Sequence, residues 1–392
     1  MSTTLVTEPA AEVASSPVGA TDHTYRVLVS VSSPGRTLDP AAFNGIDWDE
    51  LVRQARHHSL FPMLAHRLLE SSLPLPCGIR SRLKQEFQSN LLRNFALLEE
   101  SLRICRALLH GRIDAMPYKG PVMAELLWGS FALRECSDID VLVRRADVDR
   151  AGEALKRIGY NEVSPIPPSL RGAFVRDASE EQFRHGGNNI FLELQWAPAP
   201  QTLAVRFDED QLWRNRTTTI DVAGDSVSAP SPEDLFALLA IHGWKHNWSK
   251  LIWVADLAQL IRQRELDWDR LHRSASRDGW RRILSLAVAM VQRVYGEAAR
   301  APFEIDERIA VLAGRLEANL RAANNPSYLE WHRLMLSARD IRISQLRQLR
   351  NFIFMPGLAE YSSARLPEWA SAGYRAIRVA RVLRLWPSRT FQ

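Results

Sequence analysis

Two aspartates, Asp138 and Asp140, lie one residue apart in the segment SDIDVLV, whose other residues are typical of a buried strand. Side chains alternate between the two faces of a strand, so both carboxylates point to the same face. Burying two like charges is unfavourable unless a cation or another partner compensates them. Carboxylates at this spacing can bind one Mg²⁺ or Mn²⁺ ion, or a pair of such ions. The segment therefore predicts one wall of a divalent metal site.

A third carboxylate is expected from a second strand, because a metal site that acts on phosphates usually needs one more acidic ligand. Glu193, in the segment FLELQW, is the first choice, since that segment also has the composition of a core strand. An ion pair with Arg184 across the strands would explain Glu193 equally well. Asp221, in TIDVAG, is the reserve candidate, but it lies near a predicted hairpin turn.

Residues suited to phosphate binding precede the aspartates in the sequence. Lys119 and Gly120 lie where a predicted strand passes into a helix, and a helix N-terminus offers backbone N–H groups and positive partial charge to an anion. Arg134 can bind a phosphate through two nitrogens. Ser130 follows a glycine in a second turn and is a further phosphate-binding candidate, although we favour the interpretation that this turn ends the helix.

A helix that follows the mixed region carries a secondary group of candidates, His242, Lys245 and His246, with Asp256 farther along. The two histidines have the spacing of a zinc-protease motif, but Gly243 stands where the catalytic glutamate would be, so we do not expect zinc. One interpretation is a helix packed against the core through its tryptophans and histidines. The other is a group of residues that borders the nucleotide site.

The elements that must position these residues indicate an α+β chain with four parts. Residues 1–45 read as a disordered or irregular lead-in, and residues 46–110 have helical periodicity. Residues 111–230 alternate short strands and helices, with hairpins expected near residues 186–189 and across residues 217–229. Residues 231–392 read as almost entirely helical.

The order of strand, glycine turn, helix, arginine and D-x-D strand resembles the nucleotidyltransferase superfamily typified by DNA polymerase beta and the CCA-adding enzymes. More specifically, it resembles a bacterial family of uncharacterised nucleotidyltransferases. The matching residues are Lys119-Gly120, Arg134 and 138–143, together with LELQW and SPEDLFALLAIHGWKHNWSKLIWVADL. The resemblance covers roughly residues 45–265. Two departures are Lys119-Gly120, where the superfamily has G-S or G-G, and Gln195, where the family often has histidine.

The resemblance implies a small mixed sheet with flanking helices, set between the two helical regions. It implies Mg²⁺-dependent transfer of a nucleoside monophosphate from a nucleoside triphosphate, with pyrophosphate as the leaving group. Asp138 and Asp140 would hold the metal ions, and Glu193 would complete the site and act as general base or orient it. Lys119, Gly120 and Arg134 would neutralise the triphosphate. The acceptor would carry a hydroxyl group, on a small molecule or on a peptide or protein. The alternatives are a non-catalytic member that binds a nucleotide or a partner, and an RNA-modifying nucleotidyltransferase.

The composition and charge limit the class of protein. The chain has 392 residues, 46% of them hydrophobic, and a net charge of +5. No apolar run reaches the roughly 18 residues of a membrane span, and we expect a cytoplasmic protein. The C-terminus predicts a basic amphipathic helix that could weakly contact an acidic membrane surface, although a helix docked by its apolar side is the simpler interpretation. Nucleic-acid binding is not expected, because no RNA-binding motif is present. The arginines of this helix are Arg375, Arg378, Arg381, Arg384 and Arg389.

Overall fold

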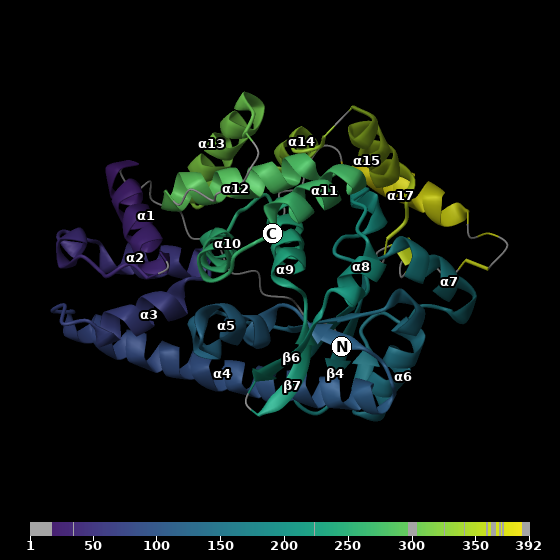
Figure 1. Ribbon diagram of the computed structural model, residues 1–392, viewed down its shortest axis with the longest axis horizontal. Coiled ribbons are helices and arrows are strands. Elements are labelled where there is room, and N and C mark those ends of the chain that lie inside the picture. Colours follow the sequence, from purple (N-terminus) through teal and green to yellow (C-terminus); the bar gives the residue numbers. More distant parts are fainter. Residues whose placement is uncertain are drawn as a thin grey trace, which may run out of the picture.

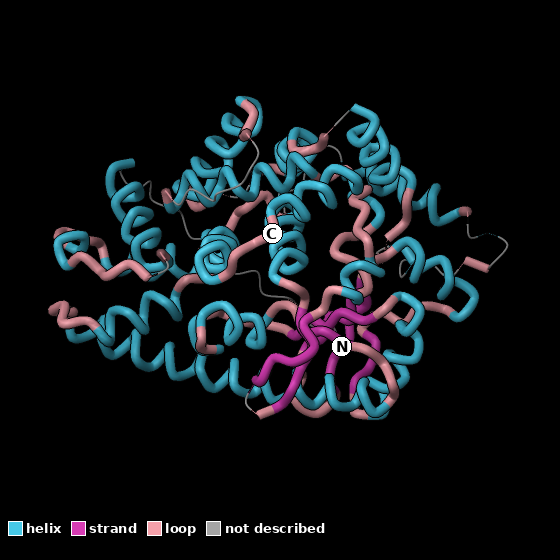
Figure 2. Tube along the Cα trace, viewed as in Figure 1, coloured by secondary structure: helices cyan, strands magenta, loops and turns pink. Residues whose placement is uncertain are grey.

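The computed structural model describes residues 18–385 except for 34, 223, 297–303, 325, 341, 358–359, 362–365, 368–369 and 371. The fold is α+β, as predicted, with the strands gathered in one part of the molecule and surrounded by helices (Figure 2). None of the described helices combines the length and the apolar character needed to cross a bilayer.

The N-terminal part consists of four helices, of which the last is the longest in the described chain (Figure 1). Asp47 caps the second helix by accepting hydrogen bonds from the backbone N–H groups of Asp49 and Glu50. A short 3₁₀ helix, η1 (Pro40–Phe43), precedes it. The four helices are α1 (Val18–Ser32), α2 (Trp48–His57), α3 (Phe61–Glu70) and α4 (Cys77–His110).

Helix α1 corrects the prediction of an irregular lead-in over residues 1–45. Tyr25, Leu28 and Val31 are buried on one side of this helix, and the Ser32 hydroxyl lies 2.9 Å from that of Tyr295 in a C-terminal helix. The Ala-, Ser- and Pro-rich composition that suggested disorder belongs mostly to residues 1–17, which lie outside the described residues. The segment that forms α1 follows directly and is short, so composition alone did not distinguish it from residues 1–17.

A five-stranded sheet forms the centre of the mixed region, in the order β1-β2-β5-β4-β3. Strands β2 and β5 are parallel, and the other neighbouring pairs are antiparallel. Both predicted hairpins are present, one joining β4 to β5 and one forming a separate two-stranded sheet of β6 and β7. The strands are β1 (Ala115–Pro117), β2 (Ile139–Val143), β3 (Tyr160–Glu162), β4 (Glu180–His185), β5 (Phe191–Gln195), β6 (Thr217–Val222) and β7 (Asp225–Ala229).

The helices of the mixed region cover the sheet unequally. One face carries Val141, Leu192 and Phe183, which belong to a buried cluster with residues of α4, α6 and α7. The other face carries Leu142, which packs with Leu212 of α8 and with Leu238 of the first C-terminal helix. The helices are α5 (Gly120–Trp128), α6 (Val148–Arg157), α7 (Pro168–Asp177) and α8 (Glu209–Arg214), with the 3₁₀ helices η2 (Phe131–Leu133), η3 (Arg145–Asp147) and η4 (Gln201–Leu203).

The C-terminal helices share one hydrophobic core with α1, α2 and α3, so the two predicted helical regions pack against each other (Figure 1). Helix α17 is docked: Arg378 and Arg381 each lie 3.4 Å from the buried Glu360. Contact of this helix with a membrane stays a prediction. The C-terminal helices are α9 (Pro232–Lys245), α10 (Leu251–Gln263), α11 (Trp268–Asp278), α12 (Arg281–Tyr295), α13 (Glu307–Arg321), α14 (Tyr328–Ser337), α15 (Arg342–Phe354) and α17 (Gly373–Leu385).

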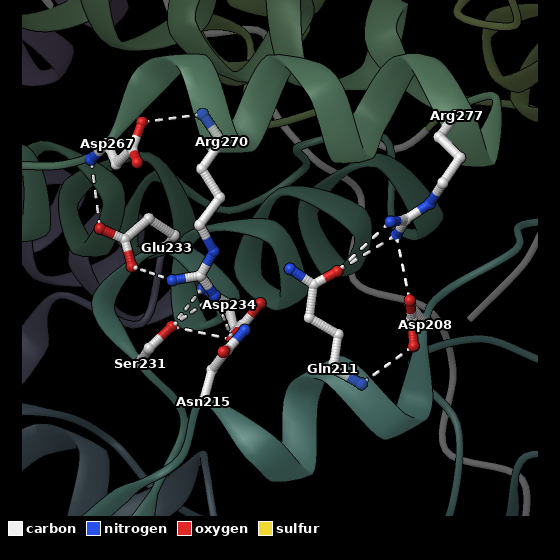
Figure 3. A network of polar contacts seen from close by, with 9 residues as sticks. All are labelled: Asp208, Gln211, Asn215, Ser231, Glu233, Asp234, Asp267, Arg270 and Arg277. Carbon is white, nitrogen blue, oxygen red and sulfur yellow. Dashed lines mark hydrogen bonds and ion pairs between the residues drawn. The ribbon is translucent and has the colours of Figure 1, made fainter.

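A polar network fixes helix α9 relative to α8 and α11 (Figure 3). Arg270 of α11 forms ion pairs with Glu233 at 3.0 Å and Asp234 at 2.8 Å, in the first turn of α9. Arg277 lies about two turns farther along α11. It forms an ion pair of 3.4 Å with Asp208, which directly precedes α8. The Arg270 contacts hold the N-terminal end of α9, and Leu238 in the middle of this helix belongs to one buried cluster with Leu142 of the sheet.

Candidate active site

Asp140 and Glu193 lie opposite each other on neighbouring strands. The register of the parallel pair β2 and β5 aligns Asp140 with Glu193 and Leu142 with Gln195. Residues aligned across two strands point to the same face of a sheet, so the two carboxylates are neighbours on that face. Asp140 is only 5% exposed. Two acids from different strands therefore meet at a largely buried position, which requires compensating partners.

The partners come from the ends of β1 and β5. The Lys119 ammonium lies 2.8 Å from Asp140 Oδ1. The Gln195 amide nitrogen donates to Asp140 Oδ1 at 2.8 Å and to Glu193 Oε2 at 2.8 Å. The Tyr118 hydroxyl donates to the Gln195 carbonyl oxygen, which directs the NH₂ group of the same amide toward the two acids. Alternation in FLELQW places Gln195 on the same strand face as Glu193, but the sequence does not indicate this bridging role or the role of Tyr118.

The electrostatics of the site leave an excess of negative charge. Burial raises the pKa of Glu193 to about 7, with Glu180 and Asp140 adding to the rise and Lys119 opposing it. Burial and the nearby Asp140 also raise the pKa of Asp138. Burial alone would lower the pKa of Lys119, but Asp140, Tyr118 and Glu193 together outweigh it and the pKa lies above its usual value. The acids thus gain from any additional positive charge.

Glu180 is an acidic neighbour that sequence reasoning missed. It lies on β4, aligned with Gln195 of β5, and therefore shares the face that carries Glu193. The alternation of Glu180 and Gln182 in EEQFRH was a signal for one polar face of a strand. The register between β4 and β5, which brings this face beside Glu193, was not readable from composition.

The Lys119-Gly120 turn lies directly against the D-x-D segment. Gly120 begins α5 with a φ of +66°, a conformation that L side chains rarely adopt. A Cβ at Gly120 would lie 3.4 Å from the backbone carbonyl oxygen of Asp138. Asp138 itself directly precedes β2, and its carboxylate accepts a hydrogen bond from Ser137 Oγ at 3.1 Å. The turn predicted to bind phosphate and the acids predicted to bind metal are therefore adjacent.

Ser130 lies at the opposite end of α5 from Lys119. The residue before it, Gly129, ends the helix in a left-handed conformation with a φ of +66°. The Ser130 hydroxyl accepts a hydrogen bond from Ala132 N at 3.3 Å and so caps η2. This local role agrees with the interpretation that the turn ends the helix, and the structure does not place Ser130 with the acids.

Arg134 and Asp256 form an ion pair of 2.8 Å, in which Asp256 is fully buried and Arg134 is 9% exposed. Asp256 also accepts a hydrogen bond from Trp128 Nε1 at 2.9 Å. The amide groups of Asn90 and Asn94 on α4 donate to the Arg134 carbonyl at 3.2 and 2.7 Å. Arg134, expected at the phosphates, thus anchors the loop before β2 to two helices. The sequence could not reveal its partner, because Asp256 lies on a distant helix.

The remaining candidates lie at the C-terminal end of α9. His242 and His246 form a ring cluster with Trp253, with ring centroids 4.7 to 5.3 Å apart. Burial lowers the pKa of His242 well below its usual value, and the positive charge of Lys119 is the next contribution, so His242 is close to the Lys119 turn. Lys245 lies in the last turn of the same helix. The charge of Lys119 also acts on His246, so this end of α9 lies within electrostatic reach of Lys119.

The residues fit a hard divalent cation by donor type, since Asp138, Asp140 and Glu193 supply carboxylate oxygens with excess negative charge. Within the described part of the chain, however, no three acidic, histidine or cysteine side chains converge closely enough to hold a metal ion. At this site the Lys119 ammonium and the Gln195 amide lie beside the acids. Asp221, the reserve candidate, lies on β6 in the separate two-stranded sheet.

Comparison with known proteins identifies the family. The model of a family described as uncharacterised nucleotidyltransferase matches residues 44–296, more than half of the 392-residue chain. Among solved structures, the chain is similar to the crystal structure of an antigenic nucleotidyltransferase-like protein from Paracoccidioides brasiliensis, with 17% identity and a TM-score of 0.35. That match covers 60% of this chain and 96% of the other. No match was found among curated proteins. The family match confirms the resemblance found in the sequence, and the chain belongs to the family of uncharacterised nucleotidyltransferases.

Proposed function

We propose that the protein transfers a nucleoside monophosphate from a nucleoside triphosphate to a hydroxyl group of an acceptor, in a Mg²⁺-dependent reaction. The observation that supports this most directly is the alignment of Asp140 with Glu193 on parallel strands, beside the Lys119-Gly120 turn. Asp138, Asp140 and Glu193 would hold Mg²⁺ or Mn²⁺. The metal, when bound, neutralises the triphosphate and the charge that develops on the leaving pyrophosphate.

The protein's own groups supply the proton transfer and the positioning. Glu193 accepts the proton of the acceptor hydroxyl, and its burial beside Glu180 and Asp140, which raises its pKa, suits a general base. Lys119 pairs with the negative charge of the phosphates, and the left-handed Gly120 lets the turn approach the D-x-D segment closely. Gln195 fixes the relative orientation of Asp140 and Glu193. His242, Lys245 and His246 border the nucleotide.

The test is the release of pyrophosphate from each of the four nucleoside triphosphates in the presence of cell extract as a source of acceptor. We expect release with Mg²⁺, none with a chelator, and none from Asp138→Asn. Asp210→Asn, at an exposed position of α8, is the matched control and should retain the activity. Equal release from Asp138→Asn and the wild type would contradict the proposal.

A second candidate function is nucleotide binding without catalysis. It is favoured by one observation, which is that no three potential metal-binding side chains converge among the described residues. Isothermal titration with ATP and Mg²⁺ separates the two functions when it is combined with the pyrophosphate assay. Binding without pyrophosphate release, across all four nucleotides and with extract present, would favour the second candidate.

A further inference from the structure

Asp140 has a cationic partner that is part of the chain. The Lys119 ammonium lies 2.8 Å from Asp140 Oδ1, and the two side chains are only 13% and 6% exposed. The Gln195 amide shares the same oxygen and also reaches Glu193. Its orientation is fixed by the Tyr118 hydroxyl. The two acids are therefore bridged by donors of the chain itself, on carboxylate oxygens that a metal ion would also need.

A divalent cation that binds Asp140 competes with this ammonium. If Lys119 left Asp140 with no new partner, a mostly buried positive charge would lose its ion-pair partner and keep only Glu193 as an anionic neighbour, which is unfavourable. A triphosphate removes this difficulty, because it offers Lys119 a second anion. Lys119 is the N-cap residue of α5, so its ammonium can serve an anion at the start of that helix as well as Asp140.

We infer that Lys119 is an internal counter-ion that occupies Asp140 in the free protein and transfers to the triphosphate, so that the metal ion and the nucleotide bind together. This inference rests on the proposed function. It makes Lys119 a positioning residue as well as a phosphate ligand. By linkage, the metal ion and the nucleotide must each raise the affinity for the other, and part of that coupling comes from this one side chain.

The inference is tested by Mn²⁺ binding, followed through the electron paramagnetic resonance signal of free Mn²⁺ at about pH 8, where Glu193 is ionised. Wild type, Lys119→Met and Lys119→Gln are compared without nucleotide. Because both variants remove the competing ammonium, we expect them to bind Mn²⁺ at least about tenfold more tightly than the wild type. Lys250→Met removes a positive charge that acts on His246 but contacts Ser59 rather than Asp140, and should change the affinity less than about threefold.

The outcomes separate this inference from the proposed function. The wild type is also titrated with Mn²⁺ and a non-hydrolysable ATP analogue, and we expect tight binding there. Tight binding with the analogue, but no gain of Mn²⁺ affinity in either Lys119 variant, would overturn the counter-ion inference alone. A gain in Lys250→Met equal to that in the Lys119 variants would also overturn it, since the effect would then be general electrostatics. Absence of Mn²⁺ binding with the analogue would overturn both. Circular dichroism of each variant confirms that it is folded.

Discussion

Asp138→Asn and Asp140→Asn remove carboxylates only two positions apart, and we expect them to change the stability of the metal-free fold in different ways. Asp140 is the ion-pair partner of Lys119 at 2.8 Å, and both side chains are largely buried. Asp138 accepts a hydrogen bond from the Ser137 hydroxyl, and its pKa is raised by burial and by Asp140. Asp140 compensates a buried cation, whereas Asp138 adds to an excess of negative charge.

The magnitudes follow from this difference. Removing one partner of a buried ion pair costs about 3–5 kcal/mol. Lys119 keeps Glu193 as a second anionic neighbour. We therefore expect Asp140→Asn to lower the free energy of unfolding by about 2–3 kcal/mol, below the full cost of an isolated buried charge. Asp138→Asn relieves repulsion, so its free energy of unfolding should lie within about 0.5 kcal/mol of the wild type or above it.

The assay is urea denaturation followed by tryptophan fluorescence, in the presence of a chelator so that no metal ion contributes. Lys119→Met and the double variant Lys119→Met/Asp140→Asn complete a double-mutant cycle. The interaction energy between the two positions should be about 1–3 kcal/mol, because the double variant leaves no unpaired member of the pair. Equal free energies of unfolding for the two Asn variants, together with an interaction energy near zero, would refute the assignment of Asp140 as the partner of Lys119.

Three further predictions concern neighbouring residues. Glu180→Gln should lower the pKa of Glu193, because Glu180 contributes to its rise. Since the base must be deprotonated, the acid limb of the kcat/KM profile should move to lower pH in the variant, and an unchanged pH profile would argue against Glu193 as the base. Gly120→Ala should lower the free energy of unfolding by about 1–2 kcal/mol because of its φ of +66°. Gly172→Ala is the control, since Gly172 lies in the middle of α7 with open space around it, and it should not lower stability. Thermal unfolding of both variants measures the difference. Asp256→Asn should lower the free energy of unfolding by about 3 kcal/mol, because it leaves the guanidinium of Arg134 buried without a counter-ion. Urea denaturation measures this, and a smaller loss would indicate that Arg134 is free to bind phosphate.

The local elements of the site were predictable from the sequence because they depend on short-range patterns. Alternation along SDIDVLV placed Asp138 and Asp140 on one face, and the strand, glycine turn and helix around Lys119-Gly120 are present in the structure. The composition of FLELQW placed Glu193 on a strand, and β5 contains it. In each case the decisive information lay within about ten residues.

The contacts that set the chemistry depend on long-range packing, which a single sequence does not reveal. Glu180 influences Glu193 only through the register of β4 and β5. Arg134 was expected at the phosphates because its guanidinium can bind a phosphate through two nitrogens, but Asp256 of α10 forms an ion pair with it in the interior. Gln195 was noted as an exception, and its bridging role became visible only when β2 and β5 were seen to be neighbours.

Nucleotidyl transfer by Asp138, Asp140 and Glu193 is tested by following the α-phosphate of the nucleotide. The protein is incubated with cell extract, Mg²⁺ and each nucleoside triphosphate labelled at the α-phosphate. The wild type should move the label to an acceptor with one pyrophosphate released per label, and Asp138→Asn, Asp140→Asn and Glu193→Gln should each abolish both. Labelling that persists in all three variants, or pyrophosphate release without a labelled acceptor, would contradict the claim.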